Sequence, residues 1–189
     1  MDNHQVESPE TSVTSRRRLL SALVAGGAFA TAAPLLASRA SAADSGSSSP
    51  ARDPQDNNAL NNALAREARM VGTYRLAAAA VSADDEVAGL TLILDHHIAY
   101  VHAIKGYLGP DAKAAAETPL SSPTGSVAAM ASGLAQLEDD TAAFHTDILA
   151  VITGMDAAKL LASIVIVEAR HAAALNMISG TTPLAASGN

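Results

Sequence analysis

The 189-residue chain contains no cysteine and no tryptophan, and aromatic residues make up only 3% of it. Without cysteine, disulfide bonds and thiolate metal sites are excluded, so the fold must be held by its core alone or by metal bound through other side chains. Scarce aromatics argue against a stacking or carbohydrate-binding surface. Basic residues are also few, and the net charge of −7 makes nucleic acid and anionic membranes unexpected partners.

The one cluster of basic residues in the sequence lies near the amino terminus, where Arg16 to Arg18 precede an apolar run from Leu19 to about Ala33. Ala40-Ser41-Ala42 then supplies the small residues that a signal peptidase requires. Charge, apolar run and small-x-small pattern together are typical of a secretion signal. The apolar run is shorter than the roughly 20 residues that span a bilayer. We therefore predict a signal peptide over 1–42 and no stable membrane anchor after cleavage.

The segment Ser15 to Leu20 reads Ser-Arg-Arg-Arg-Leu-Leu and resembles the twin-arginine consensus. That resemblance implies export of an already folded protein to the periplasm, the cell envelope or the medium. An ordinary secretory signal and an uncleaved amino-terminal anchor helix are the alternatives.

Composition divides the rest of the chain into three parts. Residues 43–53 include a Gly/Ser-rich stretch and are predicted to be a flexible linker. Residues 180–189 are small and polar and are predicted to be a loose tail. The folded unit is expected over 54–179, where abundant alanine and unclustered β-branched residues favour helix.

Sequence patterns in the folded unit predict four amphipathic helices. Asp53 followed by Pro54 indicates the first helix start. Ser82 and Asp85 form a capping pair for the second helix, and Asp156 is the expected cap of the fourth. The predicted ranges are 54–81, 83–108, 126–152 and 156–178.

The lengths of the loops between the predicted helices define the expected architecture. The first two helices are joined tightly, as are the last two, so each pair is predicted to be an antiparallel hairpin. The middle connection, from 109 to about 125, is long enough when extended to cross the bundle, although a loop that does not cross also fits. The predicted fold class is therefore an all-α four-helix bundle of two hairpins with a long middle connection.

Polar residues recur at matching places on the predicted inward faces of the two halves. The first and third helices each carry a glutamate and, seven residues later, another polar side chain, while the second and fourth each carry a histidine. This repetition predicts a pseudo-twofold site between the two hairpins. The residues are Glu67 with Tyr74, Glu138 with His145, and the histidines His97 and His171.

Three further polar residues lie near these inward positions. His96 is predicted to be at the surface, since neighbouring residues on a helix point about 100° apart, and His102 also falls beside the inward stripe. Tyr100, like Tyr74, is either a hydrogen-bond donor beside the site or an amphipathic edge of the core.

Glu168 and His171 form an E-x-x-H pair, whose spacing places both side chains on one helical face. A carboxylate and an imidazole so placed suit iron, manganese or zinc. A salt bridge of Glu168 with Arg170 or with a partner helix is the alternative. For His171 the alternative is a core histidine whose hydrogen bonds are made by other protein groups.

With these features the chain resembles the ferritin-like superfamily over about residues 56–179, in particular exported ferritin-like proteins with twin-arginine signals. In the family's di-iron form, helices one and three each give a glutamate, and helices two and four each give an E-x-x-H pair. The resemblance thus implies five metal ligands. They are Glu67, His97, Glu138, Glu168 and His171.

One ligand of that pattern is missing, because the glutamate expected three residues before His97 is Leu94. A register shifted to His96 meets Ile93 instead. The incomplete set leaves room for a single ion, for which the expected shell is Glu67, Glu138, Glu168 and His171.

The expected function is an exported metal-binding protein that holds one or two iron or manganese ions and handles oxygen or peroxide. The alternative is a metal-free ferritin-like bundle with a structural, stress-protection or partner-binding role. A metal ion is the expected partner, and both a homodimer and enzymatic activity are left open.

Overall fold

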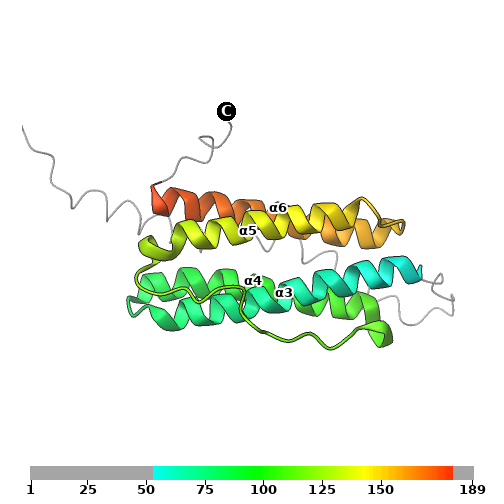
Figure 1. Ribbon diagram of the computed structural model, residues 1–189, viewed down its shortest axis with the longest axis horizontal. Coiled ribbons are helices and arrows are strands. Elements are labelled where there is room, and N and C mark those ends of the chain that lie inside the picture. Colours follow the sequence, from blue (N-terminus) through cyan, green and yellow to red (C-terminus); the bar gives the residue numbers. More distant parts are fainter. Residues whose placement is uncertain (1–52, 181–189) are drawn as a thin grey trace, which may run out of the picture.

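The computed structural model describes residues 53–180, and within them four α-helices form two antiparallel hairpins (Figure 1). Helix α3 (Pro54–Ala80) pairs with α4 (Asp84–Leu108), and α5 (Val127–Leu149) pairs with α6 (Met155–Ser179). A short 3₁₀ turn, η1 (Gly109–Asp111), follows α4. The predicted fold class is confirmed. The predicted signal peptide, the linker up to residue 52 and the tail beyond residue 180 lie outside the described residues.

Two of the predicted helix caps are wrong. Helix α3 begins as expected, with the Asp53 carboxylate accepting from the Gln55 amide at 2.7 Å. Helix α4 instead follows Ala83, which provides no side-chain cap, so its acidic first turn meets the helix dipole directly. Helix α6 follows Gly154 and not Asp156. Helix α5 ends at Leu149, three residues before the predicted end.

The turn between α5 and α6 is held by the start of α3. The Asp56 side chain is buried and accepts from the backbone amides of Thr153 at 2.9 Å and Gly154 at 2.7 Å. These bonds satisfy backbone donors at the start of α6, where the N-cap residue Gly154 has no side chain to do so. One hairpin therefore fixes the end of the other.

The middle connection crosses the bundle along α3, so that α5 starts at the opposite end from where α4 finishes (Figure 1). Gly72 allows this path, since a Cβ there would overlap the Glu117 carbonyl oxygen. Helices α4 and α5 consequently run parallel, although they are consecutive. The crossing is held by hydrogen bonds of Asn61 with Asp111 and Lys113, of Arg69 with Thr118, and of Thr73 with Leu120.

Two apolar clusters fill the bundle, one toward each end. The first includes Leu60, Leu64 and Ile164, and the second includes Met70 and Leu175. Each fully buried Leu or Ile side chain stabilises the fold by roughly 1.5–3 kcal/mol. On α4, α5 and α6, buried polar residues separate the members of the two clusters, and burial on both sides keeps these residues away from water.

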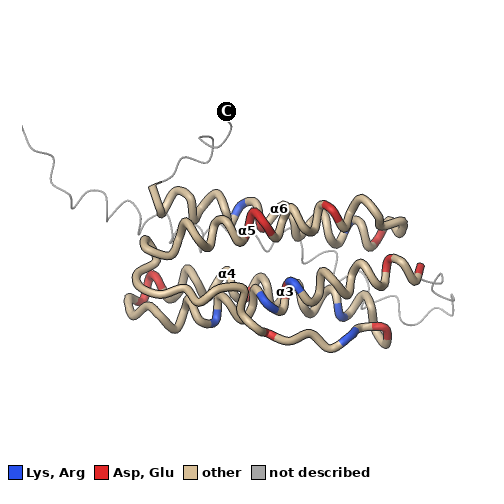
Figure 2. The backbone as a smooth tube through the Cα atoms, in the orientation of Figure 1, with Lys and Arg blue, Asp and Glu red and all other residues tan. Residues whose placement is uncertain are grey.

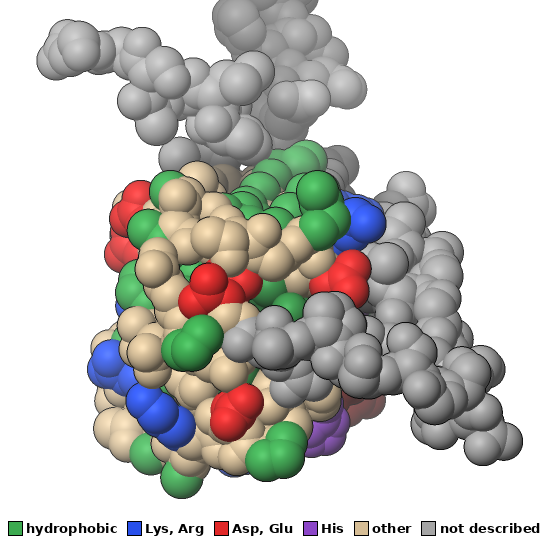
Figure 3. Space-filling view, turned by 90° about the vertical axis from the view of Figure 1, so that its right-hand side faces the viewer, with side chains coloured by type: hydrophobic (Ala, Val, Ile, Leu, Met, Phe, Trp, Pro, Cys, Tyr) green, Lys and Arg blue, Asp and Glu red, His purple; other side chains and the backbone are tan. Residues whose placement is uncertain are grey.

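Charged residues are spread over the bundle (Figure 2), and the end of the molecule seen in Figure 3 carries apolar and polar side chains side by side. Figure 2 shows charged positions distributed over both hairpins, and Figure 3 shows apolar side chains interrupted by polar and acidic ones on one end of the molecule. By length and composition, the segments Asp84–Asp111 and Met155–Ser179 are apolar enough to cross a membrane. In the bundle, however, these segments bury His97, Glu168 and His171 at its centre.

Candidate metal centre

A buried layer of three carboxylates and three imidazoles lies between the two apolar clusters. All four helices contribute to it, and each residue is at most 2% exposed. Buried ionisable groups at this density require charged partners or a metal ion. The members are Glu67 on α3, His97 on α4, Glu138 and His145 on α5, and Glu168 and His171 on α6.

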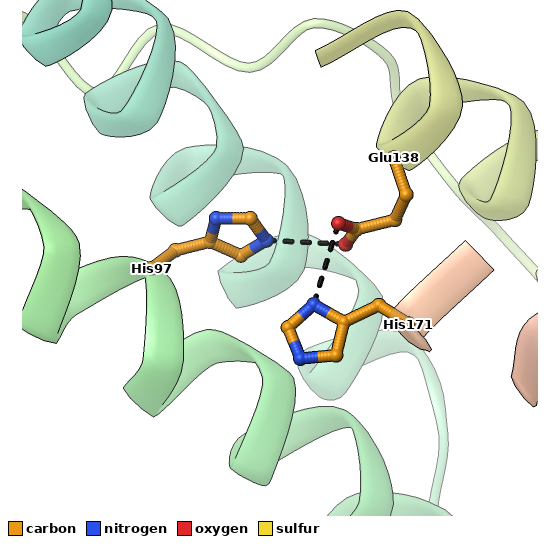
Figure 4. A group of neighbouring side chains, drawn as sticks. All are labelled: His97, Glu138 and His171. Atoms are coloured by element: carbon orange, nitrogen blue, oxygen red, sulfur yellow. Dashed lines mark hydrogen bonds and ion pairs between the residues drawn. The ribbon is translucent and has the colours of Figure 1, made fainter. Parts of the chain in front are cut away.

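Three of these residues, His97, Glu138 and His171, form a group that we call the closed triad (Figure 4). His97 Nε2 lies 3.1 Å from Glu138 Oε1, and His171 Nδ1 lies 3.3 Å from Glu138 Oε2. The Tyr74 hydroxyl also donates to Glu138 Oε1 at 2.5 Å. On its outer side, His171 Nε2 meets His96 Nδ1 at 2.8 Å. Each nitrogen and oxygen that faces the centre of this triad therefore already has a protein partner.

The other three residues, Glu67, His145 and Glu168, form the open triad. His145 Nδ1 is hydrogen-bonded to Glu168 Oε2 at 3.1 Å, and its Nε2 lies 3.4 Å from Glu67 Oε1. Glu67 Oε1, His145 Nε2 and Glu168 Oε1 are all buried without a hydrogen-bond partner among residues 53–180. The two triads touch where His97 Nδ1 meets Glu67 Oε2 at 2.7 Å.

Electrostatics give the closed triad an internal ion pair. Burial alone would lower the pKa of His97, but Glu138 and Glu67 outweigh it and raise that pKa to about 10. Burial alone would raise the pKa of Glu138, but His97 and His171 hold it well below its usual range. At neutral pH, His97 is thus a cation between two carboxylates.

In the open triad one carboxyl retains its proton. Burial raises the pKa of Glu168 to about 8, the Glu67 charge adds to this rise, and the hydrogen bond from His145 opposes it. Burial also acts to raise the pKa of Glu67, but the neighbouring His97 reverses that effect and lowers it. Without metal, Glu168 therefore stays neutral at neutral pH while Glu67 is charged.

In both triads the ligand atoms lie within 4.8 Å of one another, and the shortest pairs have the spacing of ligands around one ion. Nitrogen and oxygen ligands about 2.0–2.2 Å from a metal lie about 3.0–3.4 Å from one another at octahedral to tetrahedral angles. The distances from Glu138 to His97 and His171, 3.1 and 3.3 Å, and the 3.4 Å from His145 to Glu67 match this spacing. Imidazole with carboxylate suits iron, manganese and zinc. The residues present fit such an ion.

All five sequence-predicted ligands enter this layer, but in a different grouping. The four-residue shell expected for a single ion, Glu67, Glu138, Glu168 and His171, is not what the described structure brings together, because Glu138 and His171 belong to one triad and the two other glutamates to the second. Leu94 is half-buried and packs against both apolar clusters. The sixth donor is His145 of α5, so the layer still contains six candidate ligands.

Sequence reasoning misplaced His96, and it placed His145 in the site without counting it among the ligands. His96 was expected at the surface, and this is wrong, since it is 7% exposed and contacts His171. A helix in a bundle faces two neighbours, so residues on either side of the inward stripe are also covered. His102 is exposed, as expected. His145 had a signal in its seven-residue spacing from Glu138.

Comparisons with known proteins agree with this fold. Among solved structures, the chain is similar to the crystal structure of a conserved hypothetical protein, rv2844, from Mycobacterium tuberculosis, with a TM-score of 0.59. The two share 22% identity, and the match covers 71% of this chain and 97% of that one, which shows the fold alone. No curated protein matches the sequence. Residues 55–181 match the family model described as a ferritin-like domain, and the chain therefore belongs to the ferritin-like domain family.

Proposed function

We propose that this protein binds iron or manganese within its helical bundle, at the open triad first and at the closed triad second. The observation that carries the proposal has two parts: Glu67, His145 and Glu168 each bring a ligand atom within 4.8 Å of the others. Three of their atoms, Glu67 Oε1, His145 Nε2 and Glu168 Oε1, are also buried without hydrogen-bond partners in the described residues. An unsatisfied buried polar atom costs about 1–3 kcal/mol. A bound cation would satisfy all three at once.

The proposed chemistry is the handling of oxygen or peroxide by the bound metal. Iron or manganese would supply redox chemistry when bound at these residues. The chain would hold the ions and keep water out through the apolar clusters on either side. Tyr74 would fix the orientation of Glu138, and His96 would fix that of His171.

The complete hydrogen bonding of the closed triad supports a second candidate, a metal-free bundle with a structural or partner-binding role. In that case the ion pair of His97 with Glu138 would serve in place of a metal. Such a protein would gain nothing from the atoms of the open triad that lack hydrogen bonds, which is why we favour the metal-binding function.

The proposed site of action is outside the cytoplasm, after export by the twin-arginine route. The Ser15 to Leu20 segment supports this proposal, since that route carries folded proteins and would allow metal loading before export. The test is replacement of Arg16 and Arg17 by lysine, followed by cell fractionation. Retention of the variant in the cytoplasm is expected, and unchanged export would contradict the proposed route.

The direct test of function is elemental analysis of the exported protein. We expect one to two iron or manganese ions per chain and a lower melting temperature after EDTA treatment, because a ligand that binds only the folded state stabilises it. Protein without metal, whose melting is unchanged by EDTA and by added metal, would contradict the proposal. Glu168→Gln is the comparison variant, because it removes one ligand with little change in shape.

A further inference from the structure

Tyr100 is a buried tyrosine whose hydroxyl has no role in the hydrogen bonding described above. It is 8% exposed and follows His97 by three residues on α4, so the two side chains lie on one face. The Tyr100 ring meets the His97 ring edge-on, with 5.8 Å between the centroids. Within the described part of the chain, its hydroxyl is buried without a hydrogen-bond partner. A buried hydroxyl without a partner destabilises the fold, unless something outside the protein chain accepts a hydrogen bond from it.

The surroundings of Tyr100 place this hydroxyl near the open triad. Its ring belongs to the apolar cluster that includes Leu64 and Ile164, which precede Glu67 and Glu168 by about one helical turn. Burial raises the pKa of Tyr100 far above its usual value, and the charges of Glu67 and then Glu168 add to that rise. The Tyr100 side chain therefore lies within electrostatic reach of both glutamates of the open triad.

Tyr74, by contrast, is a buried tyrosine beside the layer whose hydroxyl does have a hydrogen-bond acceptor in the protein. Its hydroxyl donates to Glu138 of the closed triad at 2.5 Å. Among the described residues Tyr100 has no such acceptor, although it also lies beside the layer and is almost as deeply buried. The Tyr100 hydroxyl can thus donate a hydrogen bond to a small molecule bound beside the open triad.

The open triad provides a second reason for such an acceptor. It offers three protein ligand atoms, and an ion with three protein ligands keeps at least one coordination position for water or another small molecule. We propose that the open triad and Tyr100 together bind one small anion or oxygen-donor molecule, which occupies the open position on the ion and accepts a hydrogen bond from the Tyr100 hydroxyl. This inference rests on the proposed metal binding, and it adds the class of ligand that the metal would take.

The test uses the purified protein loaded with Co²⁺, whose visible absorption reports its ligands, and azide as the small anion. Azide is titrated into the wild type, Tyr100→Phe and Tyr107→Phe. The Tyr107 variant is the matched control, since it loses the same hydroxyl from the same helix seven residues farther on. We expect Tyr100→Phe to weaken azide binding about tenfold, the value of one hydrogen bond of about 1.4 kcal/mol. Its Co²⁺ content and the azide affinity of Tyr107→Phe should stay at the wild-type level.

The outcomes separate this inference from the proposed function. Equal azide affinity in the wild type and in Tyr100→Phe, or a Co²⁺-loaded wild type that binds no azide, overturns the role of Tyr100 and leaves metal binding intact. A wild type that takes up no Co²⁺ overturns the proposed metal binding and this inference with it.

Discussion

The two triads are built from the same residue types and share helices α5 and α6, yet their ligand atoms differ in hydrogen bonding. The closed triad contains two histidines and one glutamate, and its facing atoms are hydrogen-bonded within the protein. The open triad contains two glutamates and one histidine, and three of its atoms have no such partner among the described residues. The ratio of imidazole to carboxylate accounts for the difference.

A histidine can neutralise a carboxylate by taking a proton, whereas a second carboxylate cannot. In the closed triad, His97 becomes a cation and satisfies Glu138 without metal. In the open triad, Glu67 and Glu168 repel one another, and one of them must remain protonated. An excess of carboxylate over imidazole therefore attracts a cation, and we expect the first metal ion at the open triad.

The largest expected effect concerns the stability of the metal-free protein. Glu138→Gln removes a charge that pairs with buried His97 and should lower the free energy of unfolding by about 3 kcal/mol. Glu168→Gln should change it by less than about 1 kcal/mol, since Glu168 is already neutral at neutral pH. Urea denaturation after EDTA treatment measures both. If both variants lost the same free energy of unfolding, Glu138 and Glu168 would not differ in charge.

The next effect concerns affinity for the first ion. Glu168→Gln should weaken it by at least about 100-fold, because substitutions even outside the ligand shell cost 10–100-fold. Glu86→Gln, an identical change outside the layer on α4, is the control and should have no effect. Competition with a metal-binding dye gives the two dissociation constants. Wild-type affinity in the Glu168 variant would exclude the open triad as the first site.

A smaller effect concerns pH, and it has opposite signs for binding and for stability. Metal binding removes the Glu168 proton, so affinity for the first ion should rise about tenfold per pH unit up to its pKa of about 8. In the metal-free protein, the same group stabilises the fold fully below its ordinary pKa of 4.5, and this contribution disappears as pH rises to about 8. Calorimetry and thermal melting across this range test both signs. If Glu168→Gln showed the same pH dependence of affinity and stability as the wild type, that dependence would belong to another titrating group.

The smallest effect separates the second ion from the first. His96→Phe keeps a ring on α4 but removes the nitrogen that contacts His171 at 2.8 Å. We expect affinity for the second ion to fall about tenfold and that for the first to stay unchanged. His102→Phe, an exposed position on the same helix, is the control. Loss of the first ion in His96→Phe would place that ion at the closed triad.

The helices and their inward faces were predictable because burial follows a regular period. Leu60, Leu64 and Glu67 on α3 recur at spacings of four and three residues and are all buried. The caps of α4 and α6 were not predictable from local sequence, since Asp56 on a distant helix satisfies the backbone of Gly154. The crossing path of the middle connection depends on long-range bonds such as that of Thr73 with Leu120.

The members of the site could be predicted in part, but their grouping could not. Periodicity placed Glu138 and His145 on one face of the third helix, yet it does not show that they join different triads. His96 was misplaced because the inward stripe was treated as one line, whereas α4 contacts both α3 and α6. The family pattern also drew attention to Leu94 as a missing ligand, while the sixth donor came from another helix.

The most direct measurement is a crystal structure of the metal-free protein soaked with one equivalent of Mn²⁺, with anomalous diffraction to locate the ion. The account predicts a single anomalous peak among Glu67, His145 and Glu168, with the hydrogen bonds of the closed triad retained. A peak among His97, Glu138 and His171 alone, or equal peaks in both triads, would contradict it.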